Sequence, residues 1–149
     1  MSAGNALAVA LSLAGGIAVG VQVAVNGQLG KRVGVLPTFA FSVTVTVAIA
    51  VVVLLAAHQS LRGYAHVVQQ PWWLWLGGVM GAIAVLGITY SGPRIGTFAT
   101  IGLIVAGQLG VAVLIDRFGL FGLERIPVHW PRLVAIGLLA AGSVLALRK

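Results

Sequence analysis

Hydrophobic residues gather in five long apolar runs along this 149-residue chain, and short segments between the runs hold the charged residues. Each run is close to the ~20 residues that an α-helix needs to cross a hydrocarbon core ~30 Å thick. An isolated strand in a bilayer leaves its backbone groups without hydrogen-bond partners, so runs of this length predict helices. The pattern therefore predicts an all-α integral membrane protein with five transmembrane helices, at about 5–29, 36–57, 72–90, 95–115 and 131–147.

The second run contains a pattern that is also typical of a β-strand. From Ser42 to Val47 the residues alternate between hydroxyl and apolar side chains. We still expect a helix, because the apolar run around these residues is uninterrupted, and Pro37 near its start suits a first helical turn. The longest connections, 58–71 and 116–130, are expected to be loops, so residues 1–149 form a single transmembrane domain with no extramembrane domain.

Composition agrees with a membrane protein, since 60% of the residues are hydrophobic, 7% are charged and the mean hydropathy is +1.10. Soluble proteins carry about 25% charged residues. The net charge of +7 does not indicate a nucleic-acid partner, because the basic residues stand singly or in pairs between apolar runs. The lipid bilayer is the expected environment.

The distribution of the nine basic residues sets the expected orientation. With five crossings, one side holds four of them (Arg62, Arg117, Arg125 and Arg132) and the other side holds five (Lys31, Arg32, Arg94, Arg148 and Lys149). The side with more Lys and Arg usually faces the cytoplasm. A margin of one leaves two alternatives: insertion in both orientations, or a single orientation set by the Lys31–Arg32 pair.

The sequence contains no group of residues that is typical of an enzyme active site. No charged residue lies at the middle of a predicted helix, Asp116 lies at a helix end and Glu124 in a loop, and the three histidines lie in loops. The residues suggest no catalytic triad, carboxylate pair, metal-ligand cluster or phosphate loop. We therefore expect no enzymatic activity, cofactor or metal.

Uncharged polar residues form two stripes at helical spacing, Gln22 and Asn26 in the first helix and Thr97, Thr100 and Gln108 in the fourth. An amide in hydrocarbon is costly without partners, so the stripes should face protein or a wet cavity. Two interpretations stay open. The side chains join helices by hydrogen bonds worth about 0.6–2 kcal/mol each, or they line a substrate path. Trp73 either belongs to an aromatic belt at the membrane surface or joins that path.

Glycine is abundant, with 21 residues among 149, about twice the usual ~7%. Many recur at the four-residue spacing that lets membrane helices approach closely. The glycines predicted to serve helix packing are Gly16, Gly20, Gly77, Gly81, Gly102, Gly110 and Gly137.

Four segments resemble the YdcZ-type family of the drug/metabolite transporter (DMT) superfamily: residues 20–29, 71–81, 106–109 and 116–122. The resemblance implies a small, multi-pass protein of the bacterial inner membrane, whose five helices are half of a ten-helix inverted-repeat fold. The resemblance does not identify a transported substrate. An antiparallel homodimer of such a chain would mimic the inverted repeats of larger transporters, with its site at the midplane.

The expected function is that of a small-molecule exporter or permease, working by alternating access as an antiparallel homodimer with neutral polar residues along the path. One alternative is a non-transporting or regulatory subunit that pairs with a second homologous protein. A lesser alternative is a cation exporter like the small multidrug resistance proteins. That mechanism needs a carboxylate within the membrane, where this chain has Gln22 and Asn26.

Overall fold

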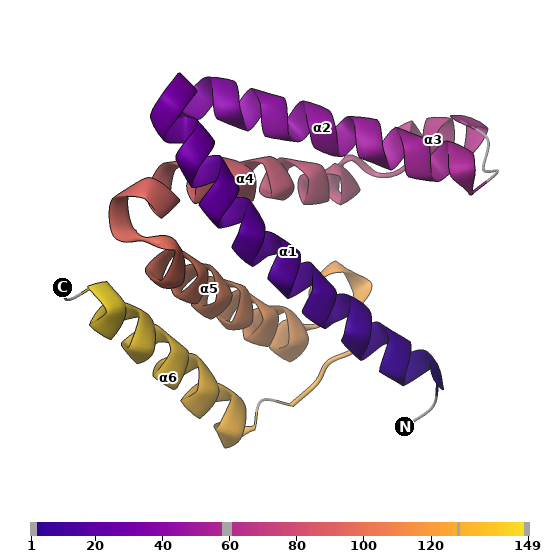
Figure 1. Cartoon of the computed structure of the whole chain (residues 1–149). Coiled ribbons are helices and arrows are strands. Elements are labelled where there is room, and N and C mark those ends of the chain that lie inside the picture. Colours follow the sequence, from indigo (N-terminus) through magenta and orange to yellow (C-terminus); the bar gives the residue numbers. More distant parts are fainter. Residues whose placement is uncertain (1–2, 58–60, 128, 148–149) are drawn as a thin grey trace. The chain divides into compact units, whose positions relative to one another are not determined.

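The computed structural model describes residues 3–57, 61–127 and 129–147, and within these ranges the chain is helical with no strand (Figure 1). The all-α prediction is confirmed, including the helical state of residues 42–47. The elements in chain order are α1 (Ala3–Val33), α2 (Val35–Ala56), α3 (Leu61–Val68), the 3₁₀ helix η1 (Trp72–Trp75), α4 (Leu76–Ile95), α5 (Thr97–Phe118), the 3₁₀ helix η2 (Leu120–Gly122) and α6 (Trp130–Leu147).

Four segments of the described chain are long and apolar enough to cross a membrane: Gly4–Val33, Val35–Ala56, Trp72–Ile95 and Thr97–Phe118. The fifth predicted span does form a helix, α6, but its apolar part among the described residues is the shorter segment Leu133–Gly142. The count of five spans is therefore not confirmed. The basic pair Arg148–Lys149, expected to close that span, lies outside the described residues.

Three helices extend beyond their predicted ends, two of which the sequence analysis had placed at charged residues. Helix α1 continues through Lys31 and Arg32, α4 continues through Arg94, and α5 includes Asp116 and Arg117. Cations in a last turn interact favourably with the carbonyl end of a helix, so they do not terminate it. Instead the helices end beside Gly34, Gly96 and Gly119, each of which has a positive φ.

Gly119 shows why such an end requires glycine. It has φ 60° and ψ 40°, the left-handed conformation common after a helix C-terminus, and its N–H donates to the carbonyl of Ile115. A Cβ atom here would lie 2.8 Å from Cγ of Arg125 and 2.9 Å from the carbonyl oxygen of Leu123. The chain folds back at this point, and the Ile126 N–H donates to the carbonyl of Asp116 over 2.9 Å.

The connection 58–71 was expected to be a loop, and this expectation was wrong because it contains α3 (Leu61–Val68). The segment is too short and too polar to cross a membrane, which is why it read as a loop. Its apolar residues nevertheless recur at helical spacing and give it one apolar face, the pattern of a helix that lies in a membrane interface.

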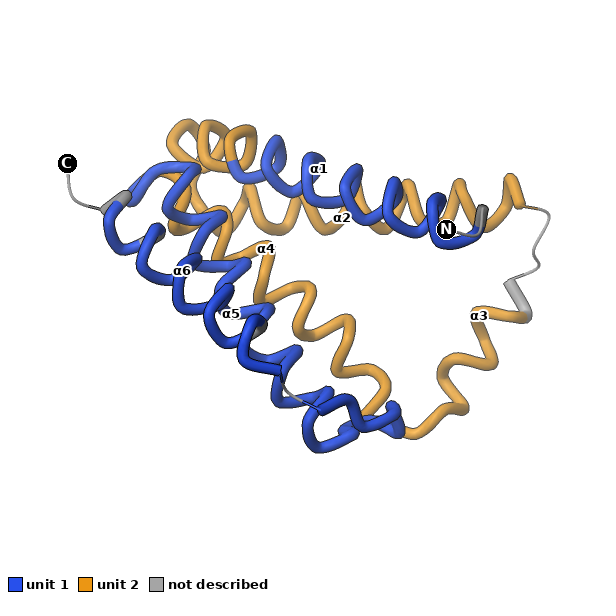
Figure 2. The backbone as a smooth tube through the Cα atoms, turned by 90° about the horizontal axis from the view of Figure 1, so that it is seen from below, with its two compact units in different colours: residues 1–23, 94–149 blue, residues 24–93 orange. Residues whose placement is uncertain are grey.

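The helices divide into two compact units, residues 1–23 with 94–149, and residues 24–93, coloured separately in Figure 2. In the first unit α5 packs along α6. The second unit contains the C-terminal part of α1 together with α2, α3, η1 and α4. Among the described apolar residues, Val23, Ile88 and Ala99 are buried, whereas most large hydrophobic side chains are exposed. An apolar exterior of this kind suits helices covered by lipid or by another membrane chain.

Candidate functional site

A cluster of small and polar residues lies in the unit of residues 24–93, where the C-terminal part of α1 contacts α2 and α4. Each member is buried or half-buried. Ser42 is hydrogen-bonded to Asn26, and Gly30 closely approaches Thr89 and Thr38. We call this cluster the Asn26 seam; its members are Asn26, Gly27 and Gly30 of α1, Thr38 and Ser42 of α2, and Thr89 of α4.

Asn26 has the one polar side chain in the seam that is only partly satisfied. It is 6% exposed, and its Oδ1 accepts a hydrogen bond from Oγ of Ser42 over 3.0 Å. Its Nδ2 is buried and has no hydrogen-bond partner within the described chain. Turning the amide over would exchange the two atoms and leave the oxygen unpaired instead. Either way, the seam holds a buried amide group with unused hydrogen-bonding capacity.

Glycines let α1 approach α4 closely on either side of this amide. A Cβ on Gly27 would lie 3.4 Å from Cδ of Pro93, and a Cβ on Gly30 would lie 3.5 Å from Cγ2 of Thr89. Pro93 has no N–H, so the carbonyl of Thr89, four residues earlier, receives no hydrogen bond from it. A carbonyl acceptor therefore lies in the same seam as the unpaired Asn26 amide.

The threonine hydroxyls of the seam are satisfied within their own helices. Thr38 and Thr89 are both 0% exposed. The Thr38 hydroxyl donates to the carbonyl of Gly34 over 2.9 Å, and that of Thr89 donates to the carbonyl of Val85 over 2.8 Å. These groups complete the packing but offer no free donor, which sets Asn26 apart from them.

The other residues of the predicted path are spread over both units. Gln22 lies one turn before Asn26 on α1 and is half-buried, as is Thr97 at the start of α5. Thr100 is 2% exposed and donates to the carbonyl of Gly96 over 2.8 Å, whereas Gln108 is exposed. Trp73 belongs to η1 in the unit of residues 24–93 and is 37% exposed. The seam thus groups Asn26 with residues that the sequence had not singled out.

Five members of the seam were missed from the sequence: Gly27, Gly30, Thr38, Ser42 and Thr89. A signal for two of them was present, because Thr38 and Ser42 are four residues apart and share a face of a helix. The alternation from Ser42 to Val47 has the period of a β-strand, so it obscures the helical spacing. Thr89 had no such signal, since nothing local relates it to α1.

The glycines predicted for packing behave differently from those of the seam. A Cβ on Gly20 would lie 3.7 Å from Cδ1 of Ile101, and Gly102 lines a groove of about 290 Å³ between α5 and α6. At the remaining five a Cβ would meet no described atom within 4 Å; these are Gly16, Gly77, Gly81, Gly110 and Gly137. Their surfaces are open to lipid or to another chain.

Metal binding finds no support in the described residues, where no group of three or more His, Cys, Asp or Glu could hold an ion. The available chemistry is that of neutral amides, hydroxyls and backbone carbonyls. Such groups can bind and release a polar molecule by hydrogen bonds.

One comparison with known proteins gives a match. A family model described as "Putative inner membrane exporter, YdcZ" matches residues 7–145, nearly the whole chain. No curated protein and no solved structure matches the chain. The family match confirms the resemblance seen in the sequence, and its description is of a transport function and not an enzymatic one.

Proposed function

Because the chain belongs to the YdcZ family of inner-membrane proteins and is a membrane transporter, we propose that it exports a small neutral polar molecule by alternating access, with the Asn26 amide as a recognition group. The family supports transport in general. The residue and the mechanism are argued from the seam.

The unpaired Nδ2 of Asn26 is the observation that carries this proposal. A buried donor without a partner costs about 1–3 kcal/mol. A substrate that accepts a hydrogen bond from this amide would recover that cost on binding. The Thr89 carbonyl would receive a donor from the same molecule. A hydroxyl- or amide-bearing substrate offers both groups, as sugars, amino acids, nucleosides and lipid headgroups do.

We include the remaining predicted path residues in the proposal as neutral groups. Gln22 adds a second amide one helical turn from Asn26, and Thr97, Thr100 and Gln108 follow α5. Trp73 would supply an aromatic face. None of these side chains is charged, which favours a neutral substrate over the cation expected of a small-multidrug-resistance-like exporter.

The proposed assembly is an antiparallel homodimer, and it depends on α6 as a fifth span. An α-helix of the 18 residues of α6 is ~27 Å long, close to a ~30 Å hydrocarbon core. With five spans the basic residues divide four to five between the two sides. With four spans, six of the nine would share the side of both termini, and one orientation would follow.

The five open glycines support a second chain in the membrane. In lipid, helices associate through close van der Waals packing at small residues. Gly77 and Gly81 form such a pair at the start of α4, where no described atom of the same chain would meet a side chain. A second copy would find the small-residue surfaces that this chain leaves uncovered.

Cysteine labelling tests the recognition role without knowledge of the substrate, because the chain contains no native cysteine. A substrate path must admit water during the transport cycle, and a thiol reacts with maleimide as the hydrated thiolate. In native membranes we expect N-ethylmaleimide to label Asn26→Cys several-fold faster than Ile88→Cys, whose position is 3% exposed.

Two controls define the range of that measurement. Gln70→Cys, at an exposed position between α3 and η1, should react fully. Val45→Cys, on an exposed apolar position of α2, should react slowly because lipid excludes water. If Asn26→Cys is as unreactive as Ile88→Cys while Gln70→Cys reacts, the seam stays dry and the recognition role is rejected.

A pair of C-terminal reporter fusions tests the assembly separately. One reporter is active only outside the cytoplasmic membrane and the other only inside. Signals from both would support insertion in two orientations and the antiparallel homodimer. A signal from one reporter alone would reject that dimer and favour a single orientation, including pairing with a second homologous protein.

A further inference from the structure

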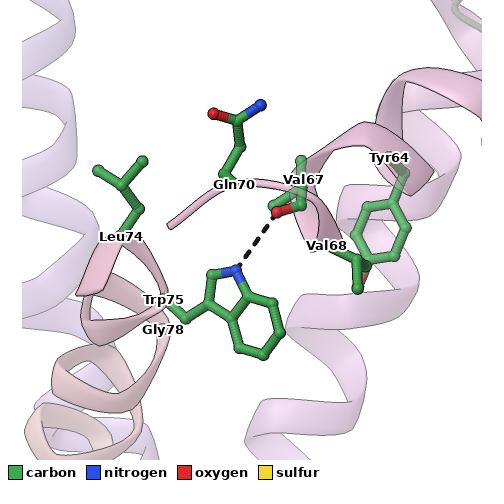
Figure 3. Close-up of a pocket in the computed structure, with 7 residues that line it drawn as sticks. All are labelled: Tyr64, Val67, Val68, Gln70, Leu74, Trp75 and Gly78. Carbon is green, nitrogen blue, oxygen red and sulfur yellow. Dashed lines mark hydrogen bonds between the residues drawn. The ribbon is translucent and has the colours of Figure 1, made fainter. Parts of the chain in front are cut away.

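A pocket lies outside the Asn26 seam, between α3 and the start of the Trp72–Ile95 span. It has a volume of about 540 Å³, within the ~300–1,000 Å³ typical of ligand pockets. Figure 3 shows its side chains, which come from two consecutive segments of the chain. The residues that matter here are Tyr64, Val67, Val68, Gln70, Leu74 and Trp75.

A hydrogen bond joins the two segments that form the walls of the pocket. The indole Nε1 of Trp75 donates to the carbonyl of Val67 over 3.3 Å, the dashed line in Figure 3. The lining is apolar and aromatic, and Gln70 supplies an amide at the rim. Such a lining suits a hydrocarbon chain better than a polar solute.

Helix α3 has two faces of different chemistry. Tyr64, Val67 and Val68 share its apolar face and line the pocket. His66 lies on the opposite side of the helix, and the sequence has the basic residue Arg62 four positions before it. The connection from residue 57 to residue 71 contains no Asp or Glu, so its charge is positive.

The place of α3 in the chain puts it at a membrane surface. It lies between α2 and the Trp72–Ile95 span, both of which are long and apolar enough to cross the bilayer. An amphipathic helix with basic residues on its polar face lies in the interface plane, with its apolar face toward the acyl chains. Three tryptophans, Trp72, Trp73 and Trp75, follow shortly after α3, and tryptophan is enriched at membrane–water interfaces.

From these observations we propose that the α3 pocket binds an anionic phospholipid of the surrounding leaflet. One acyl chain occupies the apolar space beside Trp75, and the positive charge of the connection from residue 57 to residue 71 attracts the phosphate of the headgroup. The positive connection without acidic residues matches an anionic headgroup. This site is independent of the Asn26 seam and of any transported substrate.

Quenching of tryptophan fluorescence by brominated lipids tests the site. The full chain is reconstituted with Trp72, Trp73 and Trp130 replaced by Phe, which leaves Trp75 as the reporter. Vesicles of phosphatidylcholine contain either dibrominated phosphatidylglycerol or dibrominated phosphatidylcholine. At low salt we expect the anionic lipid to compete for Trp75 about five-fold better, the effect of one basic residue near a membrane surface.

The controls separate a site from the lipid that surrounds any membrane protein. A variant that keeps only Trp130, on α6, should be quenched equally by both lipids. Arg62→Gln should abolish the preference at Trp75, and Arg62→Lys should retain it. Equal quenching of Trp75 by the two lipids, or a preference that survives Arg62→Gln, would overturn the proposal.

Discussion

Buried polar groups occur in both compact units, but their hydrogen bonds differ. In the unit of residues 1–23 and 94–149, the Thr100 hydroxyl donates to the carbonyl of Gly96 within α5. In the unit of residues 24–93, the Asn26 amide reaches Ser42 on another helix and leaves its Nδ2 unpaired. The Thr100 hydroxyl is satisfied within a single helix, whereas the Asn26 amide bonds to a residue of another helix and still has an unpaired donor.

The difference follows from the two side chains. A threonine hydroxyl on a helix can reach the carbonyl of the preceding turn, so its burial needs no other element. The asparagine amide has two donors and an acceptor, and its one hydrogen bond within the described chain is the bond from Ser42. A buried hydroxyl in a membrane helix is therefore weak support for a binding site, whereas a half-satisfied amide is strong support.

The largest expected effect comes from closing the space that the seam glycines leave. Gly30→Leu should lower the free energy of unfolding by about 1–3 kcal/mol, because a Cβ there already lies 3.5 Å from Thr89 and the remaining carbons would overpack the seam. The measurement is unfolding in mixed detergent with increasing dodecyl sulfate. Gly107→Leu on α5 is the matched control, since a Cβ at Gly107 meets no atom within 4 Å. Equal losses in both variants would contradict the close approach of α1 and α4.

An intermediate effect, of opposite sign, is expected when the unpaired amide is removed. Asn26→Leu should raise the free energy of unfolding by about 1 kcal/mol, because no buried donor is left unpaired. Ser42 can then donate to the carbonyl of Thr38, as Thr46 does to the carbonyl of Ser42. The same detergent unfolding measures it. A loss of stability would show that the amide joins the helices and is not kept for a ligand.

The smallest effect is expected at Thr100, whose hydroxyl is hydrogen-bonded to the Gly96 carbonyl at the start of its own helix. Thr100→Val should change the free energy of unfolding by about 0.5 kcal/mol or less, because the apolar side chain has nearly the same shape and leaves no buried acceptor unpaired. The backbone N–H of Thr100 still donates to the Gly96 carbonyl. If this variant loses as much stability as Gly30→Leu, or gains as much as Asn26→Leu, the proposed difference between the Thr100 hydroxyl and the Asn26 seam is wrong.

The family and the helical class were predicted from the sequence and are confirmed, and most helices were predicted to within a few residues. Asn26 as part of a substrate path stays a prediction. The prediction was wrong at two helix ends. The pairs Lys31–Arg32 and Asp116–Arg117 were expected to close their helices, but both pairs are helical, and the helices end beside Gly34 and Gly119. The segment of α3 was predicted as a loop, because the apolar pattern of an eight-residue helix is weak compared with apolar runs of about twenty residues.

What the sequence determined by itself is the membrane environment and the absence of charged residues from the middle of the long apolar runs. Long apolar runs must be helices in lipid, whatever they pack against. Only the tertiary structure decided which polar residues contact one another. The pairing of Asn26 with Ser42, and the approach of Gly30 to Thr89, join positions 16 and 59 residues apart. A helical repeat relates positions within a few turns, so bonds between helices have no signature in the local pattern.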